Sequence, residues 1–154
     1  MAKESIIIGS DHAGFDMKEA MARYLAAKGL AVTDAGTHSA DSVDYPDLGA
    51  VVARKVSTGE FARGILVCGS GVGMAIVANR FPGVRAVVAL DEETARMSRM
   101  HNDANILALA GRRTDGKTAE KIVDVWLETP FEGGRHQMRI DKITALDRDL
   151  GKGK

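Results

Sequence analysis

Short runs of apolar residues, many of them β-branched, recur along the chain, and each is followed by a segment of helix length. The first run, residues 5–9, is continuously apolar and not alternating, which is typical of a strand buried on both faces. Apolar residues then recur at helical spacing over residues 15–28, and Gly29 ends that helix. The same alternation predicts strands at residues 30–33, 64–68, 84–90 and 106–109, and helices at about 47–58, 74–79, 92–101 and 117–128.

Strands that alternate with helices in this way predict one parallel sheet with helices on both faces. Because crossovers between parallel strands are right-handed, we expect a doubly wound, Rossmann-like three-layer α/β sandwich with a five-stranded parallel sheet. An extra C-terminal helix at about residues 134–149 has no strand after it. Its apolar positions need a surface to cover, which a second subunit would supply; they are Ile140, Ile143, Leu146 and Leu150. Because no internal repeat or linker is found, residues 1–154 are expected to form a single domain.

The composition is typical of a globular protein of the cytoplasm. The 154 residues carry 21 Lys and Arg against 21 Asp and Glu, whereas nucleic acids and anionic membranes attract basic proteins. A hydrophobic content of 45% argues against intrinsic disorder. The N-terminal residues are too polar for a signal peptide, and no apolar run approaches the roughly 20 residues of a membrane span. Cys68 is the single cysteine, which excludes a disulfide within the chain. We therefore expect a cytoplasmic protein with no nucleic-acid or membrane partner.

Ligands of a doubly wound sheet bind beyond the carboxyl ends of its strands. An Asp-His pair at residues 11–12 follows the first strand, and Cys68 ends the third strand just before the glycine-rich loop 69–73. Residues 101–103 (His-Asn-Asp) end the helix after the fourth strand, and the two arginines at 112–113 follow the fifth strand. We expect all these segments to meet at one edge of the sheet, where groups that move protons lie beside groups that bind anions.

The glycine-rich loop 69–73 differs from two common nucleotide-binding motifs. Its third glycine, Gly73, comes one residue too early for the dinucleotide fingerprint. Gly9 and Gly14 have the spacing of a Walker loop, but the required lysine and hydroxyl residue do not follow them. A phospho-accepting receiver domain would need an aspartate where Cys68 stands. The backbone amides of the loop, at the start of a helix, suit instead a phosphate or a developing oxyanion.

Three residues of the expected site also have a structural interpretation. Cys68 is either a small buried hydrophobe or a thiolate, favoured by the helix N-terminus that follows, which acts as a base or nucleophile. Asp11 either points into the site or caps the next helix. His101 lies near a helix C-terminus, where capping alone would explain it. No two histidines have the sequence spacing of metal ligands, so we expect no metal site.

Two arginines near the predicted start of the last helix form the strongest single feature. Arg135 and Arg139 are four residues apart on one face, and like charges at this spacing cost about 0.2–0.5 kcal/mol. Cations near a helix N-terminus are disfavoured by a further ~0.3–1 kcal/mol. Both penalties disappear if a dianion such as a phosphate binds this face. The alternative is a solvated basic patch, or ion pairs with Glu132 and Asp141.

Five segments of the chain carry a resemblance to a known family. They are GSDHAG at residues 9–14, DYP at 44–46, CGSGVGM at 68–74, HNDAN at 101–105 and GGRHQ at 133–137. With these segments the chain closely resembles the type B ribose-5-phosphate isomerases, in the family shared with the galactose-6-phosphate isomerase subunits. The resemblance runs from the first strand to the last helix and so covers nearly the whole chain.

The resemblance implies an aldose–ketose isomerase that interconverts D-ribose 5-phosphate and D-ribulose 5-phosphate through a cis-enediolate, without metal or cofactor. A six-carbon sugar phosphate, such as allose or galactose 6-phosphate, is the alternative substrate. Cys68 matches the base that removes the proton, His101 matches the acid that assists ring opening, and Ser70 matches a hydroxyl that helps. Some members use a glutamate as the base; Met74 and Ala75 stand at the corresponding positions here, which leaves Cys68.

The resemblance also implies which residues bind the substrate. Asp11 and Asn102 match contacts to sugar hydroxyls. The backbone amides that match the cradle of the enediolate belong to Gly69, Gly71, Val72 and Gly73. The residues that match the phosphate site are His12, Arg112, Arg135 and Arg139. Members of the family are homodimers or homotetramers whose sites are completed across the subunit interface, which would cover the apolar face of the last helix.

Overall fold

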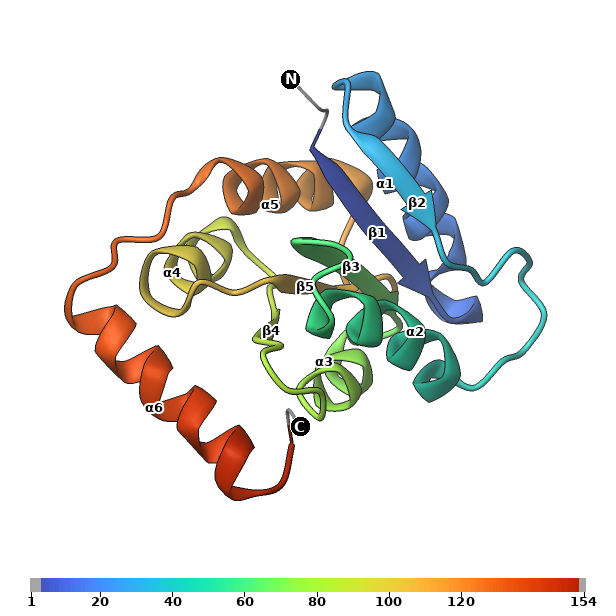
Figure 1. Cartoon of the computed structure of the whole chain (residues 1–154). Helices are drawn as coiled ribbons and strands as arrows, with labels where there is room; N and C mark the ends of the chain where they lie inside the picture. Colours follow the sequence, from blue (N-terminus) through green and yellow to red (C-terminus); the bar gives the residue numbers. More distant parts are fainter. Residues whose placement is uncertain (1–3, 153–154) are drawn as a thin grey trace.

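Five short parallel strands form one central sheet (Figure 1). The computed structural model describes residues 4–152. The strands are β1 (Ser5–Ser10), β2 (Ala31–Asp34), β3 (Arg63–Cys68), β4 (Ala86–Val88) and β5 (Ile106–Ala110). They pair in the order β2-β1-β3-β5-β4, so that β1, β3 and β5 have neighbours on both sides. Because helices also cover both faces of these inner strands, their sequences are continuously apolar.

Within residues 4–152, three helices cover one face of the sheet and two cover the other. The helices are α1 (Phe15–Ala27), α2 (Tyr45–Ser57), α3 (Val72–Ala78), α4 (Glu92–Asn102), α5 (Gly116–Glu128) and α6 (Arg135–Asp149), with a 3-10 turn, η1, at His12–Gly14. On one face Met21 of α1 and Trp126 of α5 pack against alternate residues of β1, β3 and β5. On the other face Val52 of α2 and Met74 of α3 pack against the remaining inner-strand residues. These layers confirm the predicted three-layer α/β fold.

The predicted order of elements is confirmed, and each predicted boundary agrees with the structure within two residues. The largest difference is at β4, which loses two residues at each end relative to the predicted strand 84–90. β4 is an edge strand that bonds only to β5, so its ladder is short. At one end the Val84 N–H donates to Phe81 in a turn, and at the other end Leu90 is exposed.

The direction of the strands fixes where each loop lies. All strands point the same way, so their carboxyl ends lie at one edge, here called the carboxyl edge, and their starts lie at the opposite, amino edge. The neighbouring strands β1 and β3 continue into helices on opposite faces, α1 and α3, which makes their carboxyl ends the topological switch point. A ligand cleft is expected between them.

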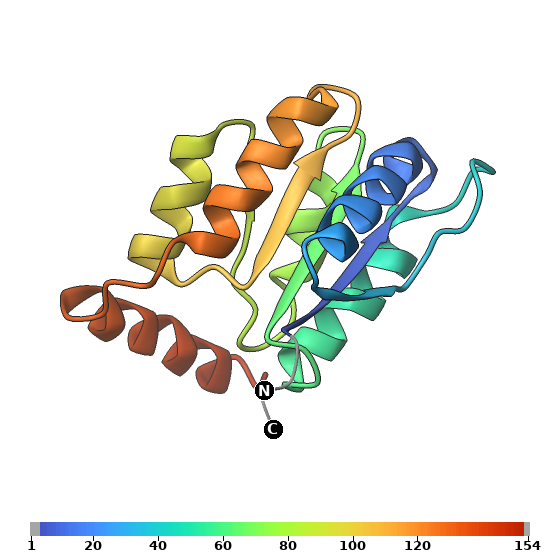
Figure 2. The same cartoon turned by 90° about the horizontal axis from the view of Figure 1, so that it is seen from above.

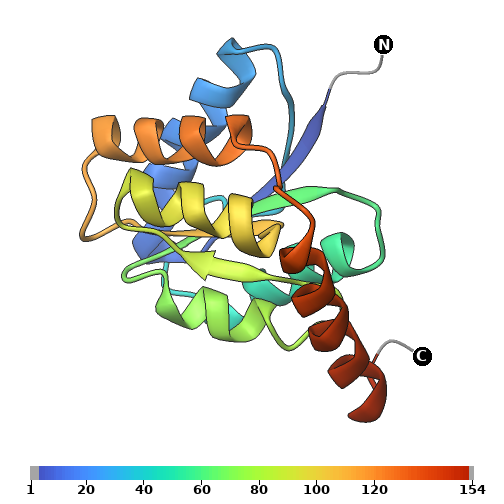
Figure 3. The ribbon, with the colours of Figure 1, turned by 90° about the vertical axis from the view of Figure 1, so that its left-hand side faces the viewer.

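Helix α6 lies apart from the three layers, near the amino edge (Figures 2 and 3). It contacts α4, and only His136 and Ile140 of its residues are buried. Its exposed apolar residues are Met138, Ile143 and Leu146, and Leu150 follows at its end. None of the helices within residues 4–152 has the length and apolar content to cross a membrane.

Candidate active site

A cavity of about 500 Å³ opens at the carboxyl edge, at the switch point between β1 and β3. This volume lies within the range of small-molecule sites. Of the predicted site residues, it is lined by Asp11, His12, Cys68, Gly69, Ser70, Gly73 and Arg112. Ala13, Tyr45 and Arg113 complete its wall. These predicted residues thus lie together around one cavity, at the edge of the sheet where the sequence analysis expected them.

Cys68 ends β3 with its side chain on the face covered by α2 and α3. The residue is only 5% exposed, yet it lines the cavity, so the thiol is buried and still reaches the candidate site. The backbone N–H of Gly71 donates a hydrogen bond to Sγ, at 3.1 Å. This hydrogen bond fixes the position of the sulfur at the cavity wall.

The glycine-rich loop after Cys68 wraps closely around the cavity. Gly71 has a φ of +78°, and a Cβ there would lie 3.2 Å from the Leu109 carbonyl, so both conformation and space require glycine. Ser70 Oγ accepts the N–H of Val72 at 3.2 Å. Of the amides expected to cradle an oxyanion, those of Gly71 and Val72 are thus already bonded within the loop, to the thiol and to the hydroxyl that are candidates for proton transfer.

The loop after β1 is held tightly against β3. Asp11 Oδ1 accepts the N–H of Gly14 at 3.0 Å, so the capping interpretation of Asp11 is confirmed, although the turn it caps is η1. A Cβ on Gly14 would come within 2.5 Å of the Val67 carbonyl oxygen, so no other residue fits. Asp11 is thereby buried in the cavity wall with its second carboxylate oxygen available for another donor.

His12 holds a second loop over the cavity. Its Nδ1 accepts the backbone N–H of Val43 at 3.1 Å, which connects the turn after β1 to the segment before α2. A ring nitrogen that accepts a hydrogen bond carries no proton, so the proton of the neutral ring is on Nε2. Nε2–H is then a donor suited to an anion in the cavity.

Arg112 and Tyr45 form the outer wall. The Arg112 backbone N–H donates to the Gly69 carbonyl at 3.1 Å, and its side chain lies along the same glycine, 3.3 Å from where a Cβ would be. The Tyr45 ring lies over Gly73, 2.8 Å from a Cβ position there. Sequence reasoning gave Tyr45 no role of its own, although it belongs to the matched segment DYP at 44–46, just at the start of a helix.

Four predicted side chains lie instead at the amino edge: His101, Asn102, Arg135 and Arg139. The expectation that residues 101–103 reach the carboxyl edge is therefore wrong. The physical reason is that α4 runs antiparallel to the strands, so its end returns to the sheet edge where β5 begins. Arg85, just before β4, donates from Nε to the Asn102 carbonyl at 3.0 Å. Gly64, near the start of β3, donates to the Asn105 carbonyl at 2.9 Å. β5 alone spans about 13 Å, so His101 and Asn102 are remote from Cys68 of the same chain.

At the amino edge, α4 and α6 bring together two histidines that are far apart in the sequence. The rings of His101 and His136 stack with centroids 4.5 Å apart and planes inclined by 16°. Glu132 Oε1 lies 3.6 Å from Nε2 of His101 and 3.5 Å from Nε2 of His136. Burial lowers the pKa of His136 below its ordinary value, and the charge on Arg135 adds to this effect.

Sequence spacing did not predict this cluster. No two histidines have the spacing of metal ligands along the chain, yet possible ligand atoms of His101, Glu132 and His136 lie within 4.8 Å of one another. The signal was missed because the cluster joins the end of α4 to the start of α6, and no periodicity connects those segments.

Arg135 and Arg139 lie in the first turns of α6 beside this cluster, and both are exposed. The alternative that they pair with Glu132 or Asp141 is not observed: within residues 4–152 neither guanidinium makes an ion pair, and Asp141 accepts from Gln137 at 2.8 Å. Two uncompensated cations therefore point away from the body of the protein at a helix N-terminus, as a phosphate site requires.

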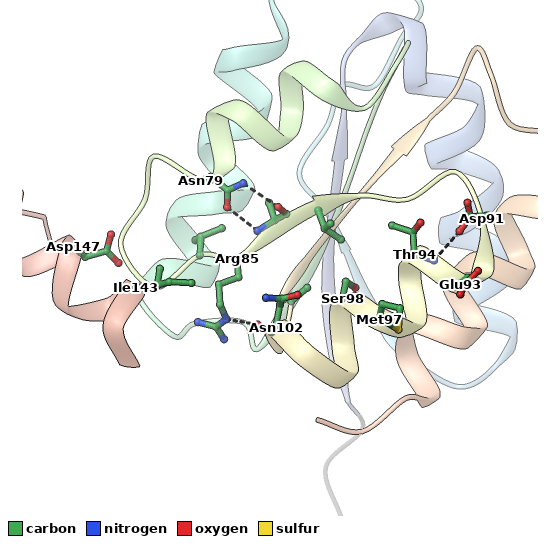
Figure 4. Close-up of a pocket in the computed structure, with 14 residues that line it drawn as sticks. Asn79, Arg85, Asp91, Glu93, Thr94, Met97, Ser98, Asn102, Ile143 and Asp147 are labelled. Carbon is green, nitrogen blue, oxygen red and sulfur yellow. Dashed lines mark hydrogen bonds between the residues drawn. The ribbon is translucent and has the colours of Figure 1, made fainter. Parts of the chain in front are cut away.

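A second, larger cleft of about 690 Å³ lies between β4, α4 and α6 (Figure 4). Apolar Met97 and Ile143 line it together with Arg85, Asn102 and Asp147. It exists because α6 stands away from the edge strand (Figure 2). It has neither a thiol nor a glycine loop, so we do not assign the chemistry to it.

Comparisons with known proteins agree on one family. The family model described as Ribose/Galactose Isomerase matches residues 6–143. The chain is 45% identical over 145 residues to ribose-5-phosphate isomerase B of Escherichia coli, covering 94% of this chain and 97% of that protein. Among solved structures, ribose-5-phosphate isomerase B of Clostridium thermocellum is 49% identical with a TM-score of 0.93, over 95% of this chain and 99% of that chain. The Mycoplasma genitalium enzyme, solved with bound ribulose-5-phosphate, is 40% identical with a TM-score of 0.92, over 97% and 99% of the two chains.

Proposed function

Because the chain belongs to the ribose/galactose isomerase family, we propose that it interconverts D-ribose 5-phosphate and D-ribulose 5-phosphate. The observation that carries this proposal is the Cys68 thiol in the wall of a 500 Å³ cavity, with an amide N–H donating to its sulfur. His12 and Arg112 line the same cavity, so a thiolate and anion-binding groups lie around one small space. An aldose–ketose isomerase needs this combination of a base and an anchor for phosphate.

Proton transfer occurs at the carboxyl edge. The Cys68 thiolate removes the proton on C2 of the open-chain aldose, and the electron pair of that bond forms the C1–C2 double bond while O1 becomes negative. Amides of the glycine loop stabilise this cis-enediolate. The thiol then returns the proton to C1, the proton of the O2 hydroxyl moves to O1, and the C2 ketone forms. Ser70, beside the sulfur at the cavity wall, assists the transfer between the oxygens.

His101 and Asn102 act in the same site from a second copy of the chain. The furanose ring must open before C2 can be deprotonated, and His101 supplies the proton to the ring oxygen. Because His101 and Cys68 lie at opposite edges of one sheet, only another protomer brings them together. The same protomer supplies Arg135 and Arg139 to the phosphate held by His12 and Arg112, while Asp11 and Asn102 bind sugar hydroxyls.

A homodimer, or a homotetramer made of two such dimers, therefore forms the working enzyme. Exposed apolar side chains are available to form this subunit contact. Besides those of α6 they include Val72, Ile76, Leu90 and Met97. The cleft beside α6 leaves room for elements of the second copy (Figure 4). We place this assembly in the cytoplasm, where a lone catalytic thiol stays reduced.

Turnover of ribose 5-phosphate, compared with that of allose 6-phosphate and galactose 6-phosphate, tests the proposal. We expect the highest kcat/KM with ribose 5-phosphate, since an extra carbon moves the phosphate away from anchors fixed relative to Cys68. A preference for a six-carbon substrate would change the proposed substrate but leave the proposed isomerase reaction in place. Absence of turnover with all three would reject the isomerase.

A further inference from the structure

Two ionisable side chains at the amino edge have no role in the chemistry described so far. Glu132 lies in the segment between α5 and α6, and His136 lies in the first turn of α6. Both face His101 at the end of α4, where Glu132 Oε1 is 3.6 Å from Nε2 of His101 and 3.5 Å from Nε2 of His136. One carboxylate oxygen thus lies between two imidazole nitrogens.

His136 is built into the fold as a fixed, neutral ring. It is only 5% exposed, and its Nε2 has no hydrogen-bond partner within residues 4–152. Burial and the charge of Arg135 lower the pKa of His136, so the ring is neutral at neutral pH. A buried donor without a partner is costly unless a small movement satisfies it. The nearest acceptor for Nε2–H is the Glu132 carboxylate.

The stack places the electron-rich face of this neutral ring against His101, with centroids 4.5 Å apart. The stack thereby fixes the orientation of the His101 ring. With one carboxylate oxygen beside the Nε2 atoms of both rings, the cluster is built to hold and orient a proton donor.

We propose that Glu132 and His136 are positioning residues that keep His101 protonated and oriented to open the sugar ring. The inference rests on the proposed function, in which His101 is the acid of that step. Glu132 accepts Nε2–H of His101, and His136 holds the carboxylate in place. Nδ1–H of His101 then gives its proton to the ring oxygen as the bond from that oxygen to C1 breaks, the anomeric hydroxyl loses its proton to water, and solvent reprotonates Nδ1.

The charges around His101 show why a carboxylate is needed there. Arg135 and Arg139 on α6 are close enough to disfavour a second positive charge in the cluster, as their effect on His136 shows. Glu132 is the one anion of the cluster that opposes them. The remaining charges at this end of α4 already pair with one another; they belong to Arg85, Arg99 and Asp103.

The experiment uses the whole enzyme and compares two reactions of the variant Glu132→Gln. With ribose 5-phosphate, which must be opened, we expect kcat to fall about 10-fold with little change in KM. The alkaline limb of the kcat profile should move to lower pH, since the protonated acid is lost sooner without the carboxylate. Ribulose 5-phosphate cannot close into a furanose, because its C5 oxygen carries the phosphate. Exchange of its C1 hydrogen with D2O, followed by NMR, should therefore keep the wild-type rate.

Matched variants distinguish positioning from a merely structural role. Glu132→Asp keeps the charge and should recover part of the kcat, and His136→Phe keeps the stack but not the donor and should give a smaller loss. Glu128→Gln, an exposed residue at the end of α5, should change neither reaction. Equal loss of turnover and hydrogen exchange in Glu132→Gln would overturn the inference, as would a raised KM alone or no change. Failure of the proposed function would appear separately, as a wild-type protein without turnover.

Discussion

The two edges of the sheet carry two halves of a site that are built in different ways. At the carboxyl edge, Cys68 and Asp11 are buried, and both accept hydrogen bonds from backbone amides of glycines nearby in sequence. At the amino edge, Arg135 and Arg139 are exposed and make no ion pair within residues 4–152. The half proposed to move the proton is rigid and enclosed, whereas the half proposed to bind phosphate is charged and open.

This difference fits the proposed division of the site between two subunits. A base must be held within a fraction of an ångström of the carbon acid, and strands and tight loops provide that precision. A phosphate anchor acts through charge, over a longer range, and long arginine side chains on a protruding helix suffice for it. Because the sheet separates the two halves within one protomer, the proposed function needs a second copy to bring them together.

The largest expected effect comes from removing the base of the carboxyl-edge half. Cys68→Ala should lower kcat by about 10²–10⁴-fold, to near background, because no other side chain in the cavity replaces the thiolate. Binding of a phosphorylated hydroxamate that mimics the enediolate, measured by calorimetry, should persist because the phosphate anchors remain. Normal turnover of this variant would exclude Cys68 as the base.

Mixing two inactive variants tests whether the halves come from different chains. In a dimer of Cys68→Ala with His101→Asn, one site has both defects and the other has none. Random reassortment after mild denaturation should therefore restore about one quarter of the wild-type rate. If both residues served the same chain's site, no mixture would regain activity, and the division between the edges proposed here would be wrong.

A smaller effect is expected from the phosphate-binding half. Arg139→Ala removes a charged contact remote from the reacting carbons, so KM for ribose 5-phosphate should rise about 10-fold while kcat changes little. Arg148→Ala is the matched control, since nine residues along α6 place it on the opposite side of the helix. A fall in kcat without a rise in KM for Arg139→Ala would assign this arginine to the chemical step instead.

The smallest effect concerns stability and is confined to the amino edge. The pKa of His136 is lowered in the folded protein by burial, by Arg135 and by other neighbouring charges, whereas in the unfolded chain it returns to about 6.5. The unfolded state then binds more protons as pH falls below that value, so stability decreases toward acid pH. His136→Phe should flatten this dependence of Tm between about pH 7 and pH 5. An unchanged slope would mean that His136 does not contribute to it.

The sequence predicted the carboxyl-edge half because its parts are contiguous with the strands that carry them. Cys68 ends a recognisable buried strand, and the glycine loop follows it directly, so their place follows from the rule for doubly wound sheets. Asp11 and His12 follow β1 in the same way. The contact of Tyr45 with Gly73 was not predictable, because it depends on where α2 crosses the sheet after a loop of ten residues between β2 and α2.

The amino-edge half was misplaced because a sequence motif does not tell which way its helix runs. The sequence analysis put His101 and Asn102 at the end of the helix after the fourth strand and expected them at the carboxyl edge, but the whole length of α4 carries them back to the start of β5. The contact of His101 with Glu132 and His136 needs both that reversal and the separate position of α6.

The sequence by itself determined the strands, the helices and the thiol at the switch point, because hydrophobic periodicity and chain continuity act between residues that are near one another along the chain. Only the tertiary structure decided which edge each group occupies and which distant side chains meet, because those contacts depend on the direction and packing of whole elements. For this protein, that position at opposite edges is the reason why we propose a site shared by two copies of the chain.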